Sequence, residues 1–341
     1  MAKPRFAASS CDVRCTFARM TYTKIQIFGT LQLNVSLLTL QADGHPQNGE
    51  GNSMIRLAVV CNDTRNWQAL AERVRGALLQ FATSTEVTEE LFDTCAAVVF
   101  LDAQTADNAN MERLLRNGKA VLLSAACCLS QEQLRTLTDA AQQGKAFFTV
   151  ANLERHLPSR SLLHQQLELG KIGEPGLIRL HRWQARVDEE IEQGLACFLC
   201  DLDLILWYFG KAPNSVYTLA QTTNEGATRI GLQVHLGFGE GGMAMLDYAN
   251  HLPTGAGYSS VSVIGSLGAA YADDHQNMQL LYQGGSPQAV RTDEGTMCLV
   301  LALQEFVDSL EQRTLHASQS SKEWHNVLSV NAAIQKSLRT K

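Results

Sequence analysis

Between residues 55 and 150, short apolar runs alternate with segments of helical spacing, and this alternation limits the possible folds more than any other feature. Four continuous apolar runs suit strands buried on both faces: 55–61, 96–101, 120–123 and 146–150. Three segments between them have helical spacing of apolar residues: 66–80, 108–116 and 130–143. Ser130 and Gln133 have the spacing of a capping box, which predicts a helix start there.

Strands that alternate with helices predict a parallel, doubly wound sheet. Little room lies between Gln80 and Asp93 for a further strand–helix–strand unit, so this sheet is expected to be shortened.

The pattern changes after Pro158. A helix is predicted over 162–169, ending at Gly170, and a long apolar helix over 194–209 is stopped by Gly210. Seven runs have β character: 171–187, 215–221, 229–238, 242–248, 258–264, 269–272 and 278–282. Glycine-rich turns between several of them favour antiparallel pairing. Two terminal helices are expected, over 296–311 and 320–338. The predicted fold class is therefore α/β, in which a shortened parallel sheet precedes an α+β domain with a large, open, mostly antiparallel sheet.

These patterns predict a domain organisation. Residues 54–151 are expected to form the first domain and residues 152–341 the second, with the terminal helices in the latter. Residues 1–53 are mildly apolar with few acids, and their longest apolar stretch is interrupted by Gln26, Thr30, Gln32 and Asn34. Because a secretory signal needs a compact apolar run, we interpret them as a disordered or mis-assigned extension ahead of Met54. A targeting peptide is the alternative.

Charge and hydropathy argue against nucleic acid and membrane as partners, and cysteine usage indicates the cellular compartment. The formal net charge is −6, which leaves no basic surface for nucleic acid. The sequence has no run of eighteen apolar residues, so we expect no membrane-spanning segment. The nine cysteines are dispersed through apolar segments rather than spaced as a disulfide framework. This usage is typical of a reducing compartment, and we expect a cytoplasmic protein.

Local motifs point to a known family. The segment 118–130, GKAVLLSAACCLS, resembles the GKHVLxEKPLAxS stretch of the glucose–fructose oxidoreductase/inositol dehydrogenase/MocA (Gfo/Idh/MocA) family. Asn152, Arg155 and Pro158 match the family's NxRxxP crossover between domains, and residues 170–180 resemble the hairpin that opens its second domain. Residues 202–218 match HxxDlxxwlxGxpxxVxa from Asp203 onward, and residues 306–337 resemble the family's C-terminal helix region. The order and spacing of these matches cover nearly all of residues 55–338.

The resemblance implies a fold and an activity. Family members have a Rossmann-type NAD(P)-binding domain, followed by a domain whose open sheet packs against another subunit. It therefore implies a homo-oligomer, or a complex with a paralogue, through the C-terminal sheet. It also implies an NAD(P)-dependent dehydrogenase or reductase that acts on a sugar, cyclitol or polyol.

The phosphate loop departs from the family pattern. Family members follow the first strand with GxGxxG, whose glycines let the backbone reach the pyrophosphate. Here Cys61 is followed by NDTRNWQALAERV, with no glycine before Gly76. Asn62, Asp63 and Arg65 would therefore lie where the pyrophosphate should be, and Asp63 would repel it. The alternative is that Thr64 or Asn66 caps a helix and no phosphate binds.

The reacting groups are also replaced. The family's catalytic lysine falls on Ala125, in an EKP motif that reads Ser124, Ala125 and Ala126 here. Its proton-exchanging histidine falls on Cys200, and the acidic partner of that histidine falls on Ala196. Its Thr-Pro turn reads Asp102–Ala103, and the histidine after it becomes Asp107. A thiol of ordinary pKa on an apolar helix is a poor substitute for imidazole.

We therefore predict no catalytic residue, no metal site and no cofactor. Cys197 and Cys200 form a CxxC, but both lie in a predicted helix, and a site that adds Cys127 and Cys128 is disfavoured. His181 and His251 have no motif partner; His251 is expected in a surface loop. Arg155 is expected in a salt bridge at the domain crossover, and Asp203 is expected to hold its helix in place. The ligand-pocket candidates are Asn62, Asp63, Arg65, Asp102, Ser124, Arg155, Cys200 and Asp203.

Three functions remain open. The first is a catalytically degenerate homologue, or pseudoenzyme, that acts as a ligand sensor, regulatory subunit or scaffold and binds a small molecule. The second is an active NAD(P)-dependent enzyme that uses Arg65 and Asn62 for the cofactor and Cys200 or water as proton donor. The third is a protein–protein module that pairs with an active paralogue.

Overall fold

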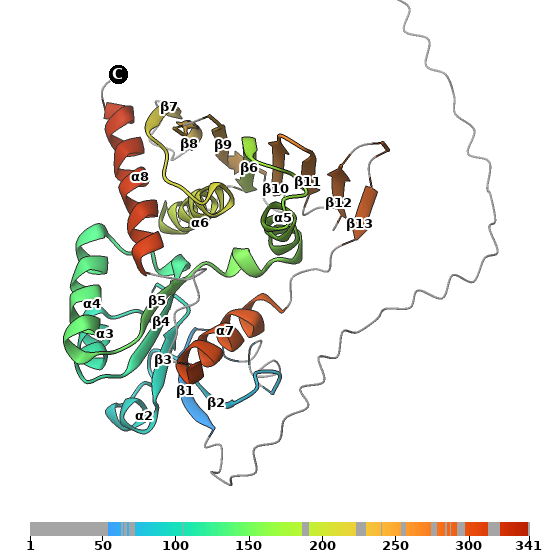
Figure 1. Cartoon of the computed structure of the whole chain (residues 1–341). Coiled ribbons are helices and arrows are strands. Elements are labelled where there is room, and N and C mark those ends of the chain that lie inside the picture. The colour runs from blue at the N-terminus through green and yellow to red at the C-terminus, as the bar shows by residue number, and fades with distance from the viewer. Residues whose placement is uncertain are drawn as a thin grey trace, which may run out of the picture. The chain divides into compact units, whose positions relative to one another are not determined.

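The computed structural model describes residues 54–62, 64, 67, 72–103, 105–185, 191–222, 230–239, 241–253, 257–273, 278–283, 285–286, 288–291, 297–312 and 321–339. Its first sheet consists of parallel strands in the order β2-β1-β3-β4-β5 (Figure 1). The five strands are β1 (Ile55–Val60), β2 (Ala77–Ala82), β3 (Ala97–Phe100), β4 (Ala120–Ser124) and β5 (Phe148–Ala151). The predicted parallel sheet is confirmed, and among the described residues no strand lies beyond β2.

Both faces of this sheet are covered, which explains why most residues of its inner strands are apolar. Alternate side chains of a strand point to opposite faces. Ala58 and Val60 of β1 pack in one core with α3 (Asn108–Arg116) and α4 (Gln131–Gly144). Leu57 and Val59 pack in a second core with α7 (Cys298–Gln312). Burial of each large apolar side chain in these cores contributes roughly 1.5–3 kcal/mol relative to exposure.

The predicted helix over 66–80 is wrong at its C-terminal end. Residues from Ala77 onward form β2, which pairs with β1 from Ile55↔Ala77 to Val60↔Ala82. This strand lies at the sheet edge, where Leu78 is 53% exposed, so its mixture of buried and exposed residues mimics helical spacing. Most of residues 63–71 lies outside the described residues. A short helix, α2 (Glu89–Thr94), was not predicted; the Thr88 side chain caps it by accepting from Leu91 N–H.

The second sheet has eight strands in the order β13-β12-β11-β10-β6-β9-β8-β7 (Figure 1). Its strands are β6 (Pro175–Ala185), β7 (Ser215–Thr222), β8 (Ile230–Gly237), β9 (Met243–Leu252), β10 (Tyr258–Gly265), β11 (Ala269–Asp273), β12 (Met278–Tyr282) and β13 (Gln288–Arg291). All pairs are antiparallel except β6 with β9, so the mostly antiparallel sheet is confirmed. The short strand β13 was not predicted. The prediction that His251 lies in a loop is wrong, because it belongs to β9.

Helix α6 (Ile191–Phe209) covers one face of this sheet through contacts with β6 and β9. Leu180, Val234, Leu246 and Val261 face α6 and are buried. The helix stops where the sequence predicts, because Gly210 has a φ of +63°, which favours glycine.

The connection between the sheets runs through two short elements. After β5, the chain forms a 3₁₀ turn, η2 (Leu153–His156), and then α5 (Pro158–Glu168), which Pro158 opens. The terminal helix α8 (Ser321–Arg339) contacts α4 and β5 of the first sheet region as well as α6 and β7 of the second. Both sheets belong to one compact unit, Gly51–Lys341. None of the described helices has the length and apolar character that crossing a membrane requires.

Candidate functional site

The strand order locates the crevice where an open parallel sheet binds ligands. From β1 the chain adds β2 on one side and then crosses to β3 on the other, so the order reverses between β1 and β3. Ligands of such sheets bind at the carboxyl ends of the strands beside this reversal. Asn62 lies just after β1, Asp102 just after β3, and Ser124 ends β4. The fold thus brings these three predicted residues to one edge of the sheet.

The carboxylate of another loop residue binds a backbone amide of the loop after β1. Asp102 Oδ2 accepts a hydrogen bond from the backbone N–H of Asn62 at 2.6 Å. The Asp102 carbonyl in turn accepts from the Thr105 hydroxyl at 2.8 Å, which holds the loop after β3 in place. Backbone amides at this edge are the groups that hold phosphates in dinucleotide-binding sheets. Here one of them already has an anionic partner from the chain itself. Asp63 and Arg65 lie outside the described residues.

The position of the family's lysine is closed. Ser124 caps the 3₁₀ turn η1 (Ala125–Cys127) by accepting from Ala126 N–H at 3.3 Å. Ala125 is 2% exposed, and η1 packs against α6. The methyl group therefore lies among packed atoms, where a lysine side chain would need space that this arrangement does not offer.

Cys200 lies on the helix that packs against this turn. Its side chain is buried, and its carbonyl oxygen accepts from Asn152 Nδ2 at 2.9 Å. Burial raises the pKa of the Cys200 thiol well above its usual value, and the negative charges of Glu154, Asp201 and Asp203 raise it further. The thiol therefore stays protonated at neutral pH and cannot act as a general base. Burial likewise raises the pKa of the Cys127 thiol, with Asp102 as the next cause.

Arg155 and Asp203 form the predicted salt bridge at the crossover. Arg155 donates from Nε and Nη2 to the two oxygens of Asp203 at 2.8 and 2.6 Å, and Asn152 Nδ2 donates to the same carboxylate at 2.8 Å. A second carboxylate, that of Glu323 in α8, accepts from Arg155 Nη1 at 2.9 Å. Burial alone would lower the pKa of Arg155, but the charges of Asp203 and Glu323 raise it. All three nitrogens of this guanidinium therefore donate to protein carboxylates.

A polar cluster under α6 was missed by sequence reasoning. Arg182 of β6 donates from Nε and Nη2 to Asp201, both at 2.6 Å, and from Nη2 to Glu154 at 2.6 Å. Tyr248 donates to Gln184, whose amide donates to Cys197 Sγ at 3.2 Å. Burial raises the pKa of Asp201 to about 6 despite the opposing effect of Arg182.

Asp201 itself was the signal for this cluster. An aspartate in the apolar helix LACFLCDLDL requires a buried cation, because an isolated buried charge is very costly.

The His181 side chain does not join the site. Since Leu180 and Arg182 point to α6, His181 between them points to the opposite face of the sheet. There its Nδ1 lies 3.3 Å from Asp247 Oδ2, and Trp183 Nε1 donates to the same oxygen at 3.2 Å. Of His251 only its place in β9 is described. Among the described residues, no group of three His, Cys, Asp or Glu side chains could hold a metal ion.

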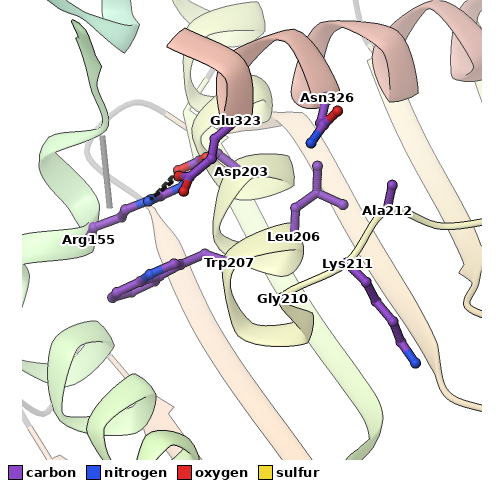
Figure 2. Close-up of a pocket in the computed structure, with 9 residues that line it drawn as sticks. All are labelled: Arg155, Asp203, Leu206, Trp207, Gly210, Lys211, Ala212, Glu323 and Asn326. Atoms are coloured by element: carbon purple, nitrogen blue, oxygen red, sulfur yellow. Dashed lines mark hydrogen bonds and ion pairs between the residues drawn. The ribbon is translucent and has the colours of Figure 1, made fainter. Parts of the chain in front are cut away.

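A small pocket lies beside the Arg155–Asp203 pair rather than at the sheet edge. Figure 2 shows it between α6 and α8, with Leu206 and Asn326 facing one another and Lys211 directed away. Trp207 forms part of its lining and stacks on His164, with ring centroids 3.7 Å apart. A cavity volume of about 130 Å³ is far too small for a dinucleotide.

Comparison with known proteins identifies the fold. No protein-family model and no curated protein matches the sequence. Among solved structures, similar ones include an oxidoreductase from Agrobacterium radiobacter in complex with NAD+, L-tartaric acid and magnesium. It has a TM-score of 0.70 at 12% identity over 84% of this chain and 96% of that chain. A candidate myo-inositol dehydrogenase from Sinorhizobium meliloti 1021 has a TM-score of 0.67 at 18% identity, covering 84% and 98%. Biliverdin reductase from Synechocystis, in complex with biliverdin and NADP+, has a TM-score of 0.65 at 15% identity, covering 84% and 99%. The fold is therefore the one that the resemblance implies, that of Gfo/Idh/MocA-type oxidoreductases.

Proposed function

We propose that this protein keeps the oxidoreductase fold, has lost hydride-transfer catalysis and acts as a cytoplasmic ligand sensor, regulatory subunit or scaffold. One observation carries the proposal: the Asp102 carboxylate binds the Asn62 amide at the edge where a pyrophosphate would lie. A phosphate oxygen that approached this amide would meet a like charge. At contact distance this costs roughly 1–4 kcal/mol, depending on the effective dielectric constant.

The replaced reacting groups support the same proposal. Reduction of a carbonyl gains from a cation or donor beside the developing alkoxide, which is typically worth about 3–4 kcal/mol. The buried methyl group of Ala125 supplies no such donor. Burial raises the pKa of the Cys200 thiol well above its usual value, so the thiol is a weaker proton donor than the imidazolium that it would replace. No catalytic residue is therefore proposed.

A titration tests the loss of the cofactor. NADH and NADPH are titrated into the full-length protein and followed by calorimetry and by tryptophan fluorescence. We expect no saturable binding below about 1 mM, which corresponds to roughly −4 kcal/mol. Saturable binding at micromolar concentration would overturn the proposal.

Two variants test whether the negative charge of Asp102 weakens cofactor binding at this edge. Asp102→Asn removes the carboxylate charge at nearly constant size, and we expect any residual NADH binding to tighten by roughly tenfold. Asp139→Asn makes the same charge change on the exposed surface of α4 and should leave binding unchanged. Equal effects of both variants would show that Asp102 has no specific role.

The solved structures with NAD+ and NADP+ favour one second candidate. In it, the chain is an active NAD(P)-dependent dehydrogenase or reductase of a sugar, cyclitol or polyol. Hydride turnover on a panel of such compounds, lost in Cys200→Ser, would establish this alternative.

The exposed face of the eight-stranded sheet is the basis for the proposed partner. The face of the eight-stranded sheet opposite α6 carries exposed large apolar side chains: Trp183, Tyr217, Leu219, Met243, Ile264 and Tyr282. Exposed apolar patches of this kind mark interaction surfaces. We assign this face to a second copy of the chain or to a paralogue, and we propose neither nucleic acid nor membrane as a partner.

A further inference from the structure

Three consecutive residues of the turn η2 contact different helices and strands of the fold. Glu154 binds Arg182 of β6 at 2.6 Å. Arg155 binds Asp203 of α6 at 2.6 Å and Glu323 of α8 at 2.9 Å. His156 Nε2 lies 3.7 Å from Glu305 Oε2 of α7. A turn of four residues thus contacts one strand and three helices through charged or titratable side chains.

These partner elements belong to both sheet regions. Helix α7 packs on the parallel sheet, where Leu303 and Phe306 share a core with Leu57 and Val59. Strand β6 and helix α6 belong to the eight-stranded sheet and its cover. Helix α8 contacts both regions. The turn is therefore the point at which the two regions are connected by ionic contacts as well as by the chain.

The central contact is deeply buried. The side chains of Arg155 and Asp203 are 5% and 2% exposed, and Figure 2 shows the guanidinium directed at Asp203 and Glu323. Rotation of the turn would leave one of these charges buried without its partner, which is strongly unfavourable.

The backbone of the turn is held at both ends. Asn152 caps it by accepting from Glu154 N–H, and the Leu157 amide donates to the Glu154 carbonyl at 3.1 Å. Pro158 then fixes φ at the first position of α5. A hinge needs residues that can absorb large changes of φ and ψ, and residues 152–158 have little such freedom.

We propose that η2 is a rigid ionic joint that holds the two sheet regions in one relative placement, so that the crevice at the sheet edge does not open by rotation at this crossover. The inference goes beyond the proposed function, because it holds whether the crevice binds a sensor ligand or a reacting substrate. It implies that ligands enter and leave through motion of loops rather than of whole lobes.

Hydrogen exchange of the full-length protein tests the joint. The amides of Arg155 and Leu157 should exchange as slowly as those in the core strand β4, because their opening requires the buried contacts to break. Exchange at the rate of an unfolded peptide of the same sequence would overturn the proposal. This measurement needs no variant, so it decides even if substitutions prevent folding.

Substitutions then test the ionic contacts. Arg155→Lys keeps the charge but loses the two-pronged contact with Asp203, and we expect exchange over 152–157 and 321–327 to accelerate roughly tenfold. Glu323→Gln breaks the ion pair between Arg155 and α8, and it should accelerate hydrogen exchange in residues 321–327 alone. The matched control is Arg116→Lys, whose exposed pair with Glu112 lies within α3 and should leave both segments unchanged. A joint whose exchange is insensitive to Arg155→Lys would be held by packing and not by charge, contrary to the proposal.

Discussion

At the scale of single residues, several charged side chains are bound by partners within the protein itself. Arg155, Arg182 and Asp203 are all satisfied by protein partners at 2.6–2.9 Å. The carboxylate of Asp102 binds a backbone amide rather than a cation. We expect that removal of one of these side chains lowers the stability of the folded protein before it affects the binding of any ligand.

The Arg155–Asp203 pair gives the clearest stability prediction. Asp203→Asn should lower the free energy of unfolding by about 3–5 kcal/mol, because it leaves a buried guanidinium short of one counter-charge. Arg116→Gln, which removes one partner of the exposed pair on α3, should cost about 0–1 kcal/mol. Urea denaturation of both variants against the wild type measures the difference, and equal losses would refute the structural role of Asp203.

His164 makes stability depend on pH. Burial lowers the pKa of this imidazole, which stacks on Trp207, and nearby Arg155 lowers it further, while Glu168 opposes them. The unfolded chain, with an ordinary pKa of about 6.5, therefore binds the proton more readily than the folded chain. Stability is thus fully present above pH 6.5 and should fall as the pH drops below that value.

The measurement is urea denaturation at pH 7.5, 6.5 and 5.5, in wild type and in His164→Phe, which keeps the stack and cannot be protonated. The variant should lose less stability on acidification, although buried His156 contributes in the same direction in both proteins. Identical pH profiles would contradict the prediction.

At the scale of helices and strands, local signals decide where elements begin and end. Ser130 caps α4 as predicted: its hydroxyl accepts from Gln133 N–H at 3.2 Å, and Gln133 Oε1 accepts from Ser130 N–H at 2.8 Å. Because both bonds lie within four residues of sequence, the motif is visible without any tertiary information.

Removal of this cap gives a prediction for the element. Ser130→Ala should lower the free energy of unfolding by about 1 kcal/mol, because it leaves helix N–H groups without a partner. Ser130→Thr retains the hydroxyl and should restore most of the loss. Thermal and urea denaturation measure the stability of both variants. An equal loss of stability in both would mean that the substitutions affect packing and not the helix cap.

At the scale of the whole molecule, the face of the eight-stranded sheet opposite α6 carries exposed large apolar side chains among the described residues. Tyr217 is 52% exposed and Leu219 is 43% exposed on β7, while Met243 on β9 is 54% exposed. Charged residues at these positions should prevent association through this face.

Tyr217→Lys combined with Leu219→Lys tests this surface. We expect the wild type to elute as a dimer or larger species in size-exclusion chromatography with light scattering, and the double variant as a monomer. The matched control is Leu301→Lys, which places the same charge at an exposed apolar position on α7. A wild type that is monomeric at high micromolar concentration would contradict a homo-oligomer and leave a paralogue as the partner.

Much of the fold could be predicted from periodicity. The buried strands β1, β3, β4 and β5 were recognisable because both their faces are covered and most of their residues are apolar. The edge strand β2 was not, since only pairing with β1 distinguishes its mixed pattern from a helix. The cluster of Arg182, Glu154 and Asp201 joins residues from β6, η2 and α6, and sequence spacing cannot show such a meeting.

The kinds of side chain at the predicted site are a property of the chain before it folds: Ala125 and Cys200 stand where the resemblance implies a lysine and a histidine, and no glycine lies between Cys61 and Gly76. These are covalent facts that folding cannot change. What the remaining polar groups bind depends instead on how the chain folds. A hydrogen bond directs Asp102 to the Asn62 amide, and burial pairs Arg155 with Asp203 and Arg182 with Glu154 and Asp201. A charge removed from water requires a partner nearby, and that partner is supplied by whichever element the fold places beside it.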